Sequence, residues 1–451
     1  MSMSNSASSS STDAERTNQV ISKQEQDKFR CFQIPPKMYF EHDAIQYLEK
    51  MHDITRAFIA TDSSVKKLGY VDRILYYLRR RQVYVHSEIY LDIPSHPDIE
   101  CVKKGVDAMN RFRPNVIIAL GGGTAIDAAK GMWLLYNNPH LSFDEMRRNF
   151  EPYGSRSLII SEEQKKAKFV AIPTTSGTGS EVTCFSVISD HGHEKGKLAL
   201  VNDSFIPDVA IMDPQFTKTL PKNLIADCGM DVLTHCIEAY VTKEASDYTD
   251  GLALQGAEMV FEYLEKSYRV GDEISREKMH NAACIGGMAF ANAFLGLTHS
   301  MAHKLGGEYN IPHGRANSVL LPFVIEFNAR IGPFAQKEEE SQKEADPVAL
   351  ERCHLKEPLF RYSKMARILG LPAKTPEEGT LSLVQEVRKL AKSLDRPSTI
   401  KECGVDEALF LAKLPALCAA VLEDQCTPPN PRTPSARDVE ELFKKAYYGE
   451  L

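Results

Sequence analysis

The chain has 451 residues, and its 54 Lys and Arg against 61 Asp and Glu give a formal net charge of −7. With 43% hydrophobic and 25% charged residues, its composition is that of an ordinary soluble globular protein, which excludes a wholly disordered chain, a collagen and a small disulfide scaffold. The mild acidity argues against a general affinity for nucleic acid or for an anionic membrane.

The first 30 residues differ in composition from the rest of the chain. Seven serines lie between residues 2 and 11 and few large apolar groups follow, so we expect a disordered tail over 1–30. This segment lacks the features of a signal peptide, and no run of about 18 uncharged apolar residues predicts a membrane span. The ten cysteines form no C-x-x-C pair, which favours a reduced, cytoplasmic compartment over a disulfide framework.

Strand-like and helix-like segments alternate from residue 31 to about residue 218. Strands are predicted at 57–62, 82–89, 116–120, 169–173, 187–190 and 209–213, and helices at 65–80, 99–112 and 124–136. This alternation predicts a parallel α/β domain over 31–218.

The pattern changes after Pro221, where almost no strand-like segments remain. Helices are predicted at 227–242, 248–268, 274–294, 298–306, 316–331, 358–369, 376–394 and 405–418. We therefore expect an all-helical domain over 219–451. The charged stretch 338–344 within it is predicted to be a loop or a solvated helix.

Two loops of the predicted α/β domain are candidates for binding a phosphorylated cofactor. Gly121, Gly122, Gly123 and Thr124 follow a buried strand and open a helix, a layout that lets the backbone and a helix N-terminus approach an anion. The alternative is a tight strand–helix turn, since neither the G-x-G-x-x-G nor the P-loop pattern is present. The second loop, 174–181, also follows a strand, and its alternative is a merely solvated loop.

Asp62, at the end of the first predicted strand, is a candidate partner for a ribose hydroxyl. An acid in this position would repel a 2′-phosphate, so NAD is favoured over NADP. The alternative for this residue is a helix cap, which is the commoner role of an aspartate before a helix.

A possible metal site lies in the helical half. Asp231 and His235 share one face of a predicted helix, His299 and His303 repeat the same spacing of four, and His313 follows a proline. The best arrangement uses Asp231, His235, His299 and His313 as ligands, with His303 one turn beyond His299. Three imidazoles and a carboxylate suit Fe(II) or Zn(II). The alternative is a set of satisfied helix residues, but five buried polar groups on apolar helices would each need a partner.

Five segments, in this order along the chain, together resemble the iron-containing (group III) alcohol dehydrogenases, and in particular the alcohol dehydrogenase half of the bifunctional aldehyde/alcohol dehydrogenases. The resemblance extends over residues 33–450, and 423–432 (EDQCTPPNPR) adds to it. No aldehyde dehydrogenase half is found within the sequence, so only the second reduction step is expected. The five segments are GGGTAIDAAK, TTSGTGSEVT, GMDVLTHCIEAY, FANAFLGLTHSMAHKLG and IPHGRAN.

The resemblance implies a Rossmann-like NAD(P) domain followed by a helical domain, with a divalent metal, usually iron, between the four ligands named above. It places His303 near substrate and nicotinamide. It implies a homo-oligomer without fixing its size. Cofactor-lining positions implied by the resemblance are Asp62, Gly121, Gly122, Gly123, Thr124, Thr174, Thr175, Val187 and Lys197, and pocket-lining positions are Phe290 and Cys426.

These features predict reversible hydride transfer between NAD(H) and a small aldehyde/alcohol pair such as acetaldehyde and ethanol. His303 is the candidate proton relay, with the orientation of a metal ligand as its alternative role. One rival function is a lyase or cyclase resembling dehydroquinate synthase, which would want several basic residues in the pocket. The other is a non-catalytic relative that forms assemblies, against which the intact ligand set counts.

Overall fold

A six-stranded parallel sheet is built from the first half of the chain in the computed structural model, which describes residues 31–143, 145, 165–189, 197–334 and 357–449. The predicted disordered tail 1–30 and the charged stretch 338–344 lie outside these residues and stay predictions. In sheet order the strands are β1 (Met38–Phe40), β8 (Val209–Met212), β5 (Lys168–Pro173), β4 (Val116–Gly121), β2 (Arg56–Ala60) and β3 (His86–Tyr90).

The central strands are apolar on both faces because helices cover both sides of the sheet. In β4, Ile117 and Ala119 pack with the apolar residues of α5 (Ile99–Phe112) and α6 (Gly123–Asn137). The alternate residues Val116, Ile118 and Leu120 belong to the core on the opposite face, which α4 (Tyr70–Arg79) also lines. The predicted Rossmann-like fold class of the first half is therefore confirmed.

Three local features differ from the sequence prediction. The single helix expected at 65–80 is two helices, α3 (Ser63–Lys67) and α4, which meet at Gly69 with a φ of 79°. The strand expected at 187–190 is β6 (Phe185–Ser189), which pairs antiparallel with an unpredicted strand, β7 (Lys197–Val201). It is therefore not part of the parallel sheet. The short strand β1 was also not predicted, because three residues carry too little periodic signal.

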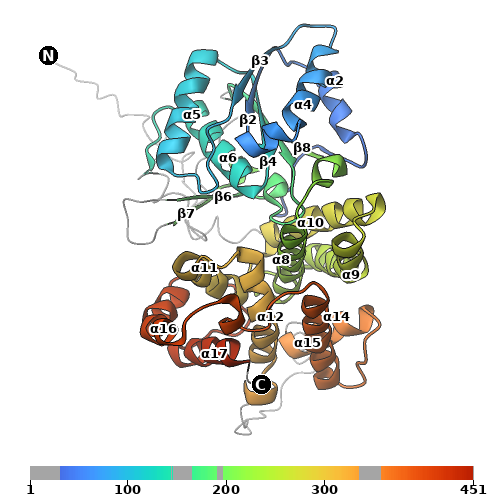
Figure 1. Cartoon of the computed structure of the whole chain (residues 1–451), viewed down its shortest axis with the longest axis vertical. Coiled ribbons are helices and arrows are strands. Elements are labelled where there is room, and N and C mark those ends of the chain that lie inside the picture. The colour runs from blue at the N-terminus through green and yellow to red at the C-terminus, as the bar shows by residue number, and fades with distance from the viewer. Residues whose placement is uncertain (1–30, 144, 146–164, 190–196, 335–356, 450–451) are drawn as a thin grey trace, which may run out of the picture. The chain divides into compact units, whose positions relative to one another are not determined.

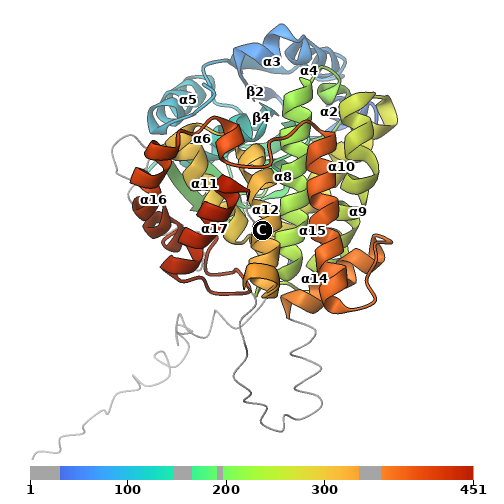
Figure 2. The same ribbon diagram turned by 60° about the horizontal axis from the view of Figure 1, so that its bottom comes forward.

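The second half of the described chain consists of helices. Three of them, α8, α9 and α10, pack together around one apolar core, and α11, α12, α16 and α17 surround another (Figures 1 and 2). The helices are α8 (Lys222–Val241), α9 (Asp247–Arg269), α10 (Glu273–Ala293), α11 (Leu297–Tyr309), α12 (His313–Ala329), α14 (Pro358–Ile368), α15 (Pro376–Ser393), α16 (Glu407–Leu422) and α17 (Ala436–Tyr448).

Helix α17 was not predicted, although Ser435 and Asp438 form a capping box at its start. Helix α8 is apolar nearly all round and almost wholly buried, as expected for a helix at the centre of a bundle. Among the described residues, no single helix is long and apolar enough to cross a membrane. Helices α10 and α11 meet that test only as a pair, and the chain bends by 107° between them.

The two halves touch through backbone as well as side chains. The loop after β5 reaches α10, where Gly179 and Gly287 approach each other so closely that a Cβ on Gly179 would lie 2.6 Å from Gly287 Cα. Ser176 Oγ, in the same loop, lies 3.0 Å from Nδ1 of the buried His280 on α10. Helix α10 of the helical half thus contacts the candidate cofactor loop 174–181 through main-chain and side-chain atoms.

Candidate active site

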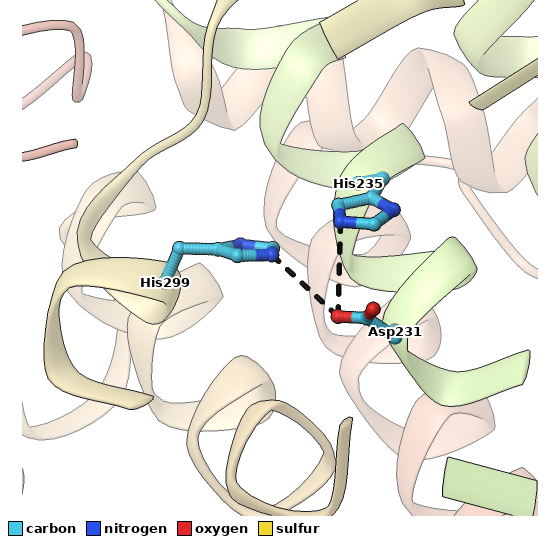
Figure 3. A group of neighbouring side chains, drawn as sticks. All are labelled: Asp231, His235 and His299. Carbon is cyan, nitrogen blue, oxygen red and sulfur yellow. Dashed lines mark ion pairs between the residues drawn. The ribbon is translucent and has the colours of Figure 1, made fainter. Parts of the chain in front are cut away.

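The four candidate metal ligands come together from three helices. Asp231 and His235 lie one turn apart on α8, His299 lies on α11 and His313 begins α12. Asp231 Oδ1 is their common neighbour, at 3.7 Å from Nε2 of His235 and 3.6 Å from Nε2 of His299 (Figure 3). Its distance to Nε2 of His313 is 3.4 Å. Each of the three imidazoles therefore brings Nε2 close to Asp231 Oδ1, and the ligand atoms of Asp231, His235 and His299 all lie within 4.8 Å of one another.

The chemistry of this group fits a divalent transition metal. The amide Nδ2 of Asn317 donates to Asp231 Oδ1 at 2.7 Å and lies 3.3 Å from Nε2 of both His299 and His313. A donor group surrounded by lone pairs occupies the kind of position that suits a cation. The opposite amide atom, Asn317 Oδ1, is buried without a hydrogen-bond partner among the described residues. Three imidazole nitrogens and a carboxylate oxygen are a usual donor set for iron or zinc.

The charges in the group also favour a cation. Burial lowers the pKa of His235 to about 4, so this ring is neutral at neutral pH, whereas the side chain of His313 is 41% exposed. Burial opposes a charge on His299 as well, but Glu238 and Asp231 raise its pKa to about 9. Although burial works to raise it, the surrounding imidazoles of His235, His313 and His299 hold the pKa of Asp231 well below its usual range, and among them His299 carries an extra proton at neutral pH. At neutral pH the His299 ring, between the carboxylates of Glu238 and Asp231, therefore carries an extra proton, and a metal bound by this ring would replace that proton.

Glu238 was not predicted from the sequence and is central to the geometry. It lies on α8, on the same face as Asp231 and His235, and is 3% exposed. Its Oε2 is 2.6 Å from His299 Nδ1. The spacing of 231, 235 and 238 along one helix is the signal that could have indicated it.

His303 lies one turn beyond His299 on α11 and faces His313, with the two ring centroids 5.4 Å apart. Its Nδ1 is 3.1 Å from Oδ2 of Asp424, and Lys304 Nζ donates to the same oxygen at 2.7 Å. Burial disfavours the Asp424 carboxylate, but His303 and Lys304 hold its pKa well below the usual range. Asp424 was also missed, because 121 residues separate it from His303.

The two predicted pocket-lining residues both lie against this group. Phe290, on α10, stacks on the candidate ligand His235 with ring centroids 4.3 Å apart. Cys426 is buried, and its backbone N–H donates to Asp424 Oδ1 at 2.9 Å. Ligand atoms of Cys426, Asp424 and His303 lie within 4.8 Å of one another. The structure thus brings both residues to the group.

The two candidate cofactor loops lie side by side at the carboxyl ends of β4 and β5. Thr174 N–H donates to Gly121 O at 3.0 Å, and a Cβ on Gly123 would lie 2.6 Å from Thr178 Oγ1. Helix α6 begins here without a side-chain cap, with Gly122 at the N-cap position. Its first N–H groups are suited to an anion. Thr124 is exposed in the first turn, and Thr175 packs beside Gly122.

Three of the predicted cofactor-lining residues lie outside the two loops: Asp62, Val187 and Lys197. Asp62 is the N-cap of α3, where Oδ1 accepts from Ser64 N and Val65 N, so the cap alternative is realised. Its Oδ2 faces Gly121, 3.9 Å from where a Cβ would stand. Val187 is exposed on β6, and Lys197 begins β7, where it pairs with Ser189 of β6. Behind the glycine loop, Lys130 of α6 is buried, and its Nζ donates to Thr183 O and Phe185 O at 2.7 Å.

Comparison with known proteins gives one consistent result. Residues 35–214 match the family described as iron-containing alcohol dehydrogenase, and residues 225–447 match the C-terminal part of the same family. The chain is 45% identical over 422 residues to aldehyde-alcohol dehydrogenase 2 of Entamoeba histolytica, which covers 94% of this chain and 47% of that protein. It therefore spans about half the length of this relative.

Two further relatives match along their whole length. The NADPH-dependent butanol dehydrogenase of Clostridium saccharobutylicum is 39% identical, covering 93% of this chain and 98% of that protein. The solved structure of an iron-containing alcohol dehydrogenase from Thermococcus thioreducens is 32% identical with a TM-score of 0.78, covering 93% of this chain and 100% of that one. The chain belongs to the iron-containing alcohol dehydrogenase family, as its sequence motifs predicted.

Proposed function

We propose that this protein is a metal-dependent alcohol dehydrogenase that transfers a hydride between NAD(H) and a small primary alcohol/aldehyde pair, such as ethanol and acetaldehyde. The observation that carries the proposal is the convergence of Asp231, His235, His299 and His313 on one point, with His303 beside them. When bound there, Fe(II), or alternatively Zn(II), supplies Lewis acidity that stabilises an alkoxide oxygen.

In this proposal His303 moves the alcohol proton. Its Nδ1 faces the Asp424 carboxylate, which favours a proton on that nitrogen and leaves Nε2 as the acceptor. Lys304 keeps Asp424 ionised through the 2.7 Å ion pair. The ring is 30% exposed, which leaves solvent able to take the proton onward. Phe290 and Cys426 enclose the substrate carbon.

The two loops of the α/β half bind the dinucleotide in this proposal. Backbone N–H groups from Gly121 to Thr124, with the hydroxyls of Thr174 and Thr175, meet the pyrophosphate and ribose, and the β6–β7 hairpin lines the nicotinamide. Asp62 accepts from ribose hydroxyls and favours NAD over NADP. The Clostridium relative is named as NADPH-dependent, so the preference of this chain needs its own measurement.

The cellular setting belongs to the proposal as well. No disulfide joins two cysteines of the described part of the chain, which supports a reduced, cytoplasmic compartment. A homo-oligomer and domain limits of 31–218 and 219–451 are proposed from the family resemblance. No nucleic acid or membrane partner is proposed.

The test is NADH oxidation with acetaldehyde by full-length protein stripped of metal and reloaded anaerobically with Fe(II) or Zn(II). We expect turnover only in the reloaded protein. Undiminished turnover without metal contradicts the Lewis-acid role. If the metal-loaded protein oxidises no NADH with any short-chain aldehyde, the dehydrogenase proposal is contradicted. A cyclase-like or a non-catalytic function is then favoured.

A further inference from the structure

Glu238 makes three hydrogen-bond contacts at the start of α11. Oε2 accepts from Gly296 N at 2.9 Å and lies 2.6 Å from His299 Nδ1, while Oε1 accepts from Thr298 N at 2.7 Å. Glu238 therefore holds both the first turn of α11 and the ring of the candidate ligand that this turn carries.

The backbone before this turn is in a conformation that needs such support. Phe294 has φ 61° and ψ −170°, a region that residues with a side chain rarely adopt. Beyond it, the N–H groups of Gly296 and Thr298 point to Glu238, and that of Leu297 donates to Asn430 Oδ1 at 3.0 Å. The 107° corner between α10 and α11 is thus fixed by two buried side chains from other elements.

The ring contact has a chemical consequence. A carboxylate can only accept, so the 2.6 Å contact requires a proton on Nδ1 of His299. The other ring nitrogen, Nε2, then faces Asp231 at 3.6 Å, where the remaining candidate ligands converge. In known metal sites, a carboxylate behind a ligating histidine fixes its tautomer and raises its basicity.

We propose that Glu238 is the positioning residue of the metal centre: it holds the proton of His299 on Nδ1, presents Nε2 as the ligand atom and fixes the corner that carries it. This inference rests on the proposed function, because it assumes that the four-residue group holds a metal. It goes beyond the ligand set by assigning a role to a residue that would not touch the metal.

The test compares Glu238→Gln and Glu238→Ala with the matched variant Glu326→Gln. Glu326, near the end of α12, is also 3% exposed, but it pairs with Arg388 of α15. Titration of full-length, metal-free protein with Zn(II) gives the affinity directly, without any activity assay. We expect about 10- to 100-fold weaker binding for Glu238→Gln, a larger loss for Glu238→Ala, and wild-type affinity for Glu326→Gln.

Unchanged Zn(II) affinity in folded Glu238→Gln overturns the inference, whereas no Zn(II) binding by the wild type overturns the proposed function instead. If the Glu238 variants do not fold, ¹⁵N NMR of the histidines in Zn(II)-loaded wild type decides the matter. The inference requires His299 with a proton on Nδ1 and the metal on Nε2. The reverse assignment rules it out.

Discussion

The two halves of the candidate site are constructed in different ways. In the α/β half the two glycine- and threonine-containing loops offer backbone donors, and main-chain atoms hold them together, as Thr174 N–H does with Gly121 O. In the helical half the chemistry comes entirely from side chains, and buried carboxylates far away in the sequence orient them. Glu238 and His299 are 61 residues apart, and Asp424 and His303 are 121 apart. Substitutions of loop side chains leave the backbone donors of the α/β half in place. In the helical half, by contrast, a single substitution removes a ligand atom or the carboxylate that orients it.

The largest effect should follow from Asp231→Ala, because its Oδ1 is the common neighbour of three imidazoles. We expect loss of bound metal and a fall in kcat of about a thousandfold, the size of several kcal/mol of lost charge stabilisation. Metal analysis and steady-state kinetics measure both. Asp250→Asn, at the ion pair with Arg361, is the control and should keep its metal. Retained metal in Asp231→Ala would remove this residue from the ligand set.

Asp424→Asn tests the second carboxylate that lies far in sequence from the histidine it contacts, here His303. The amide can donate to His303 and so favours the wrong tautomer, and we expect kcat to fall about 100-fold or more with metal content unchanged. Ser300→Ala is the control, since Ser300 Oγ reaches Asp424 only at Oδ1, at 3.5 Å, and not at the Oδ2 that faces His303. Its other contacts are with Thr427 and Gly296. Equal losses in both variants would mean that Asp424 has a packing role alone.

Metal binding should depend on pH through His299. Its pKa is raised to about 9 in the metal-free site, so at neutral pH the ring holds a proton that the metal must displace. We therefore expect one proton released for each Zn(II) bound, and affinity falling about tenfold for each pH unit below about 9. Calorimetry in buffers of different ionisation enthalpy counts the proton. Proton uptake, or no proton change at pH 7, would contradict this charge assignment.

The smallest effect is expected in the α/β half. Asp62→Ala should lower the preference for NAD over NADP by about tenfold, or about 1.4 kcal/mol, by removing a charge beside the ribose. It should also cost about 1 kcal/mol of stability, because Asp62 caps α3. Asp98→Ala removes a similar cap from α5 and is the control for stability. An unchanged NAD/NADP ratio of kcat/KM would leave Asp62 as a cap only.

The same contrast explains how far the sequence could go. The long helices and the central strands were predictable because each carries its own periodicity, and α5 begins and ends where the pattern indicated. The candidate ligands were found because pairs of them share one helix face. Spacing along α8 could have indicated Glu238 beside Asp231 and His235, but not its contact with His299 on another helix, and no spacing links Asp424 to His303. The antiparallel pairing of β6 with β7 was missed because these two strands form a separate sheet, outside the alternation of strands and helices that predicts the parallel sheet.

The contact between Gly179 and Gly287 limits how the two halves of the described chain can move. Here backbone lies against backbone, with Val182 packed beside it and no long side chain to give way. Sliding one part past the other would drive main-chain atoms together, so shear is blocked at this point, while rotation about it is not. Cofactor entry and release would then require a hinge with this glycine pair as its fulcrum. Even a methyl group at either position would shift the pivot.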